Sequence, residues 1–250
     1  FVNRITRSGT HIRLPLLVSF GLLWVISIAI SAWSSYSTSN AILDKNITEK
    51  FNDVFLIHEH EIEDQAKIQE IILFNLLKNK ELIDAFASEN VENIISLTES
   101  IYQKINQENR ITHFYFIRTD KTVLYRAHAP QRKNDVITRK TLKDSSLNQN
   151  LVSGLEFGVL GTFTLRSVSP VLRDGNLLGY LELGMELGHV VENIEQQLHV
   201  NVVELIDKKL IEANVADNIF LLTGRKANES ALSSHVVVQA QDADLNRDKL

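Results

Sequence analysis

The chain has 250 residues, 44% of them hydrophobic and 23% charged, with a formal net charge of −5 and no cysteine. This composition excludes wholesale disorder, and the lack of cysteine excludes disulfide scaffolds, thiolate metal sites and cysteine nucleophiles. The charge is mildly negative and forms no basic stripe, so we expect no nucleic-acid partner. The chain begins with Phe1 rather than Met and ends in a polar stretch, so we expect it to be part of a longer protein.

The first predicted element is a transmembrane helix at residues 14–35, which would bind the lipid bilayer. No charged residue occurs from Leu14 to Leu43, and the apolar run from Leu14 to Trp33 spans 20 residues. At about 1.5 Å per residue this run reaches about 30 Å, the hydrocarbon thickness of a bilayer. Three arginines and no acid precede it, which places residues 1–13 in the cytoplasm and the remainder outside. A cleaved signal peptide is the alternative, but its apolar region would have only about 7–15 residues.

Residues 36–110 are predicted to be helical. Apolar side chains recur at steps of three and four from Ile47 to Ala66, and the segment contains neither Gly nor Pro. The pattern predicts a stalk helix over about Asn40–Lys80 and further helix after it, with a break near Ser88–Asn90. The apolar stripe of the stalk also predicts a homodimer.

From Ile111 the pattern becomes that of strands. Residues 113–130 predict a hairpin, residues 134–154 a short helical connection ending near Gly154, and residues 161–185 a second hairpin with an Asp-Gly turn. An amphipathic helix follows. This order predicts an α+β fold with an antiparallel sheet of about four or five strands and flanking helices.

Four short motifs carry a resemblance to a known family. They are R-x-H-x-P at Arg126–Pro130, G-x-E-x-G at Gly154–Gly158, R-x-x-x-P at Arg166–Pro170 and the strand GYLELG at Gly179–Gly184. With them, residues 40–210 resemble the extracytoplasmic double Cache sensory domains of bacterial histidine kinases, chemoreceptors and related signalling proteins. Asn134 departs from the family, which usually has Gly before the matching Asp.

The resemblance implies a PAS-like sheet carried on a long helix that leaves the membrane. Residues 111–199 would form the membrane-distal Cache module, and residues 200–250 the incomplete start of a second one. A second transmembrane helix is expected beyond it.

Six polar residues form the candidate ligand-binding site. If the two hairpins are neighbours in one sheet, Arg126 and Arg166 converge on one face under the connection 131–158. Two guanidinium groups beside an imidazole suit a carboxylate or similar anion, and the acids suit an ammonium group or orient the arginines. The other interpretation is that these charges pair with each other and fix the connection to the sheet. The six are Arg126, His128, Asp135, Arg139, Glu156 and Arg166.

We expect neither a catalytic site nor a metal or cofactor site in this segment. In HEHE, His58–Glu61, the two histidines lie about 200° apart around a helix and cannot share an ion. The glycines 154, 158 and 161 match neither the dinucleotide nor the phosphate-loop fingerprint, and their spacing is typical of turns. A histidine kinase, chemotaxis or cyclic-dinucleotide output would lie outside the chain.

The sequence therefore predicts a signal-transduction receptor of the bacterial inner membrane with a periplasmic sensory part. It would bind a small molecule bearing a carboxylate or an amine and signal to a cytoplasmic output module. The alternative is an anchored interaction domain that senses by docking a binding protein.

Overall fold

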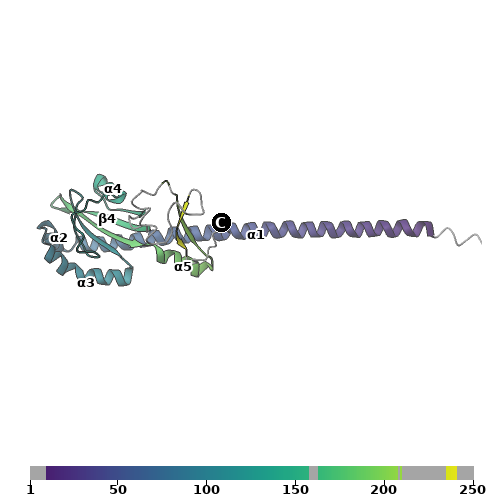
Figure 1. Ribbon diagram of the computed structural model, residues 1–250, viewed down its shortest axis with the longest axis horizontal. Helices are drawn as coiled ribbons and strands as arrows, with labels where there is room; N and C mark the ends of the chain where they lie inside the picture. Colours follow the sequence, from purple (N-terminus) through teal and green to yellow (C-terminus); the bar gives the residue numbers. More distant parts are fainter. Residues whose placement is uncertain (1–9, 158–162, 208, 210–234, 241–250) are drawn as a thin grey trace, which may run out of the picture. The chain divides into compact units, whose positions relative to one another are not determined.

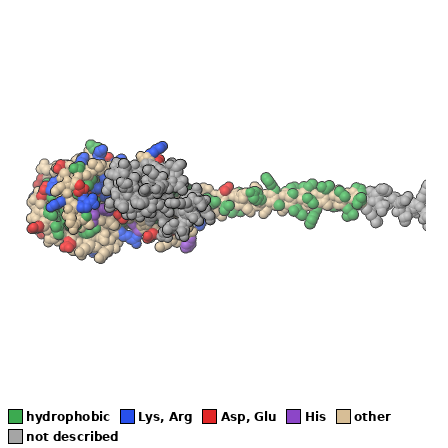
Figure 2. All heavy atoms as spheres, in the orientation of Figure 1, with side chains coloured by type: hydrophobic (Ala, Val, Ile, Leu, Met, Phe, Trp, Pro, Cys, Tyr) green, Lys and Arg blue, Asp and Glu red, His purple; other side chains and the backbone are tan. Residues whose placement is uncertain are grey.

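The computed structural model describes residues 10–157, 163–207, 209 and 235–240. The chain divides into two compact units, residues 1–55 and residues 56–250. Helix α1 runs from Thr10 to Leu77, and over residues 14–50 its side chains are exposed. Figure 2 shows hydrophobic side chains along this exposed part.

Among the described residues, one helix is long and apolar enough to cross a membrane. It covers Leu14–Leu77, and its most apolar window has a mean hydropathy of 2.2. This stretch contains the span that the sequence predicts at residues 14–35. Residues 1–9 of the predicted cytoplasmic segment lie outside the described residues.

Two short breaks separate α1 from the next helices. Helix α2 spans Lys80–Ala87 and helix α3 spans Val91–Asn109. The side chain of Asn79 accepts a hydrogen bond from the backbone N–H of Leu82 at 3.1 Å and so caps α2. The side chain of Asn90 accepts one from the backbone N–H of Asn93 at 3.1 Å and so caps α3. The predicted helix end near Lys80 and the break near Ser88–Asn90 are confirmed.

A five-stranded antiparallel sheet follows, with strand order β2-β1-β5-β4-β3 (Figure 1). The first hairpin pairs with the second through β1 and β5, so the two hairpins are neighbours in one sheet. The predicted α+β class is confirmed. The strands are β1 His113–Arg118, β2 Val123–Arg126, β3 Val152–Phe157, β4 Phe163–Arg173 and β5 Asn176–Glu186.

Strand β3 corrects the predicted helical connection. Helix α4 covers only Lys140–Asn148, and Val152–Phe157 pairs with β4 as an edge strand. The segment contains Gly and Glu, which have low strand propensity, so its pattern is weak and its pairing is set by contact with β4. Gly158 and Gly161 lie outside the described residues.

The two faces of the sheet have different covers. Phe116 packs edge to face on Phe86 of α2 at 5.4 Å, and the buried Gln69 of α1 donates a hydrogen bond to the Leu165 carbonyl at 3.2 Å. In Figure 1, α4 lies on the other side of the sheet from α2 and α3. The connection from β2 to α4 therefore lies over the face opposite the long helices, and we call this connection the cover.

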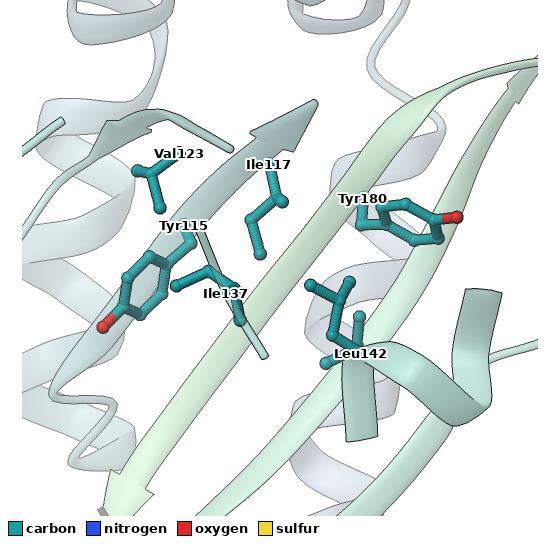
Figure 3. Packing of buried hydrophobic residues seen from close by; sticks show 7 residues of the cluster. Tyr115, Ile117, Val123, Ile137, Leu142 and Tyr180 are labelled. Atoms are coloured by element: carbon teal, nitrogen blue, oxygen red, sulfur yellow. The ribbon is translucent and has the colours of Figure 1, made fainter. Parts of the chain in front are cut away.

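A small apolar core holds this connection in place. Ile137 and Leu142 pack on Tyr115, Ile117 and Tyr180 of the sheet (Figure 3). All five side chains are at most 6% exposed. The connection is therefore anchored to the sheet at Ile137 and at Leu142 of α4.

The sheet is followed by helix α5, Gly188–Leu198, and by two short strands. Strand β6, Val203–Asp207, pairs antiparallel with β7, His235–Ala240. Most of the predicted second module, residues 210–234 and 241–250, lies outside the described residues.

Candidate ligand-binding site

Strand register brings the predicted arginines to one face of the sheet. Tyr115 of β1 lies opposite both Arg126 of β2 and Glu182 of β5, while Arg166 of β4 lies opposite Gly184 of β5. Directly opposite residues share a face, as do alternate residues of one strand, so all these side chains point the same way. The prediction that Arg126 and Arg166 lie on one side of one sheet is confirmed.

Tyr115, Arg126 and Arg166 line a cavity of about 200 Å³ between the sheet and the segment 132–139. A Cβ at Gly184 would lie 3.2 Å from Nη1 of Arg166, so a glycine there leaves room for the Arg166 side chain. Five of the six predicted residues contribute to the lining, and Glu156 contacts two of them. The polar and aromatic lining includes His113, Tyr115, Arg126, His128, Arg132, Asp135, Arg139, Thr164 and Arg166.

Arg126 is held by one carboxylate from the cover. Its side chain is 2% exposed, and Nη2 donates to both oxygens of Asp135 at 2.8 and 2.7 Å. Its guanidinium lies 5.0 Å from the centre of the Tyr115 ring. Burial alone would raise the pKa of Asp135, but the hydrogen bond and charge of Arg126 outweigh it, so this pKa is lowered. Asp135 itself is 47% exposed, at the outer edge of the site.

The other two arginines share a carboxylate that sequence reasoning missed. Glu182 is fully buried, and its Oε1 accepts hydrogen bonds from Nη1 of Arg166 at 2.8 Å and from Nη2 of Arg139. Burial opposes the charged form of Glu182, yet the charges and hydrogen bonds of Arg139 and Arg166 lower its pKa. The signal was present, because Glu182 is an acid in the middle of the apolar strand GYLELG.

Glu156 connects this charge network to helix α4. Its Oε1 accepts a hydrogen bond from the Thr141 backbone N–H at 2.7 Å, in the first turn of α4. Its Oε2 lies 3.7 Å from Nε of Arg139 and 3.6 Å from Nε of Arg166. The five charged residues of the predicted set therefore pair with each other and fix the connection to the sheet, as the second interpretation expected, whereas His128 forms no ion pair.

Pairing leaves several buried polar atoms unused. Within the described part of the chain, the Nε atoms of Arg126, Arg139 and Arg166 are buried without a hydrogen-bond partner. Oε2 of Glu156 and Oε2 of Glu182 are also buried without a hydrogen-bond partner. Most buried polar atoms in proteins have such a partner, so these atoms beside the cavity can hydrogen-bond to a water molecule or to another polar group.

Two histidines on the cavity wall are neutral. His128 accepts a hydrogen bond from the Phe114 backbone N–H at 3.3 Å, and its ring centre lies 4.6 Å from that of His113. Burial, helped by nearby arginines, lowers the pKa of His113 to about 2 and that of His128 to about 4. His128 is therefore a neutral imidazole near neutral pH, and the positive charge at the cavity comes from the arginines.

Within the described ranges, no group of three or more His, Asp or Glu residues has the geometry to hold a metal ion. His58, from the HEHE segment of α1, is half-buried, and burial lowers its pKa. The polar groups at the cavity include guanidinium, carboxylate and imidazole groups.

Comparisons with known proteins agree with this architecture. The sequence model of a family described as the double sensory domain of two-component sensor kinases matches residues 45–241. Among curated proteins, none matches this sequence.

Several solved structures are similar to this chain. A domain of a sensory box/GGDEF family protein from Vibrio parahaemolyticus is 15% identical, with a TM-score of 0.51 over 64% of this chain and 69% of that one. The extracellular domain of a protein described as the histidine kinase vpHK1S-Z8 is 16% identical, with a TM-score of 0.50 over 65% and 68%. The Escherichia coli DcuS sensor domain is 17% identical, with a TM-score of 0.45 over 54% and 97%.

Proposed function

Since the chain belongs to the family of double sensory domains of two-component sensor kinases, as its Cache motifs predicted, we propose that it is a membrane-anchored receptor for a small molecule. The observation that supports this most strongly is the cavity beside Arg126, a buried arginine whose Nε has no hydrogen-bond partner. A purely structural salt-bridge network would fill its own hydrogen-bonding capacity.

The ligand carries a carboxylate or an amine. A carboxylate would approach Arg126, which presents an unused Nε and is held only by the half-exposed Asp135. Tyr115 and His128 flank that position, with their ring centres 4.8 Å apart. An ammonium group would instead pair with Asp135.

Membrane anchoring is supported by the apolar stretch of α1, which would place the sensory part in the periplasm and residues 1–13 in the cytoplasm. A homodimer along α1 would bring two copies together. The solved relatives include a protein described as a histidine kinase and a sensory box/GGDEF protein, which supports an output of one of these classes. The output module would lie outside this chain.

The sheet offers a route for the signal from the cavity to α1. Arg166 points into the cavity, and the carbonyl of the preceding Leu165 accepts the hydrogen bond of Gln69. A ligand shifts the signalling equilibrium only by the difference between its affinities for the two states. Binding that changes the position of β4 would therefore change the contact made by α1.

The test is a calorimetric screen of the complete chain in detergent micelles against amino acids, organic acids and amines. A true ligand raises the Tm by mass action. Arg126→Gln should remove this shift. The matched control is Arg173→Gln, which changes an exposed arginine on β4 that pairs with Asp84.

Two results would contradict the proposal. In one, no compound raises the Tm. In the other, Arg126→Gln keeps the same shift as the Arg173→Gln control. Docking of a binding protein in the absence of any small-molecule shift would support the interaction-domain alternative.

A further inference from the structure

We infer that the cavity accepts a single carboxylate, at Arg126, and rejects a second anionic group, because Glu182 and Glu156 are built-in counter-anions of Arg139 and Arg166. The inference rests on the proposed function and names the charge class of its ligand. That class is a small molecule with one carboxylate and no second negative charge.

The counter-anion of Arg166 and Arg139 cannot be exchanged. Glu182 is 0% exposed in the middle of β5, which has β1 on one side and β4 on the other. Its Oε1 is already shared between the two guanidinium groups. A ligand carboxylate taking its place would leave a buried carboxylate without its cations, which is strongly unfavourable.

Glu156 reinforces this arrangement from the edge strand. Its side chain is 11% exposed, and one oxygen is bound to the Thr141 N–H at the start of α4. The other oxygen faces Nε of both arginines at 3.6–3.7 Å. Moving Glu156 away would therefore also remove a helix cap.

Arg126 differs from the other two arginines in its counter-ion. Asp135 is 47% exposed, whereas Glu182 and Glu156 are 0% and 11% exposed. Its carboxylate can turn into water and stay solvated, so a ligand carboxylate can replace it at little cost. The unpartnered Nε of Arg126 provides a further donor for the incoming group.

The charges around the cavity limit the number of negative charges that a ligand can carry. Arg126, Arg139 and Arg166 are matched by three carboxylates, and the two neighbouring histidines are neutral. The fourth arginine of the lining, Arg132, is exposed to solvent, where an ion pair contributes little. A second ligand anion would therefore lie near Glu182 and Glu156 and be repelled.

The test compares butyrate with succinate, which have the same carbon skeleton length and differ by one carboxylate. Titration calorimetry of the complete chain in detergent micelles should show that the wild type binds butyrate about tenfold more tightly than succinate. Glu182→Gln frees one positive charge and should tighten succinate binding by about tenfold, with little change for butyrate. Glu186→Gln makes the same charge change on β5 outside the cavity lining and should leave both affinities unchanged.

The inference is overturned if the wild type binds succinate as tightly as butyrate, or if Glu182→Gln gains no succinate binding. Should that variant fail to fold, Glu156→Gln serves instead, since its amide oxygen still accepts the Thr141 hydrogen bond. If the variant binds succinate no more tightly than the wild type, only the inference about the charge of the ligand is overturned. The proposed function falls separately, by the absence of any ligand whose binding depends on Arg126.

Discussion

The two cavity histidines should make the folded protein sensitive to mild acid. Burial lowers the pKa of His113 to about 2 and that of His128 to about 4, from the 6.5 of a free histidine. The unfolded chain therefore binds these protons below pH 6.5, while the folded chain binds them only near pH 4 and below. Their contribution to stability is complete above pH 6.5 and is lost as the pH falls toward 4.

The size of the effect follows from these pKa values. Lowering the pH from 7 to 5.5 should reduce the free energy of unfolding by about 1.2 kcal/mol for each histidine, or about 2.5 kcal/mol for both. For a domain of this size that corresponds to a fall in Tm of about 5–10 °C.

Scanning calorimetry of the complete chain at the two pH values measures this fall directly. In the double variant His113→Gln, His128→Gln, the fall in Tm between the two pH values should be smaller by about 5–10 °C. His60→Gln, which changes an exposed histidine of α1, is the control and should keep the wild-type fall. An identical pH dependence in the wild type and the double variant would refute the reasoning.

Two further changes test the packing around the site. Arg166→Met should destabilise the domain by about 3–5 kcal/mol in scanning calorimetry, because it leaves the buried Glu182 with one cation fewer. A loss below about 1 kcal/mol would show that this pair is not buried in solution. Gly179→Ala should cost about 2–4 kcal/mol, since Gly179 has φ +149° and a Cβ there would lie 2.3 Å from the Ile117 carbonyl oxygen. An unchanged Tm in that variant would contradict the register of β1 against β5.

The shared face of Arg126 and Arg166 was predictable from the sequence. Each arginine lies in a strand of one of two hairpins, and the turns between their strands mark the hairpins clearly. Alternation along a strand then fixes which residues point the same way. The prediction further required only that the hairpins be adjacent, which they are through β1 and β5.

The partners of these arginines were harder to predict. Arg139, the residue that precedes α4, binds Glu182, which lies 43 positions later in the sequence. Such a contact depends on how the cover is placed over the sheet, which local patterns do not encode. The same holds for β3, whose pairing with β4 overrides a weak strand pattern.

The most direct test of the central claim is a structure of the complete chain with the compound that raises its Tm most. The account predicts that the compound lies in the cavity between the sheet and the segment 132–139, with its charged group within hydrogen-bonding distance of Arg126 or Asp135. A compound bound elsewhere on the protein, with the Arg126–Asp135 pair unchanged, would contradict it.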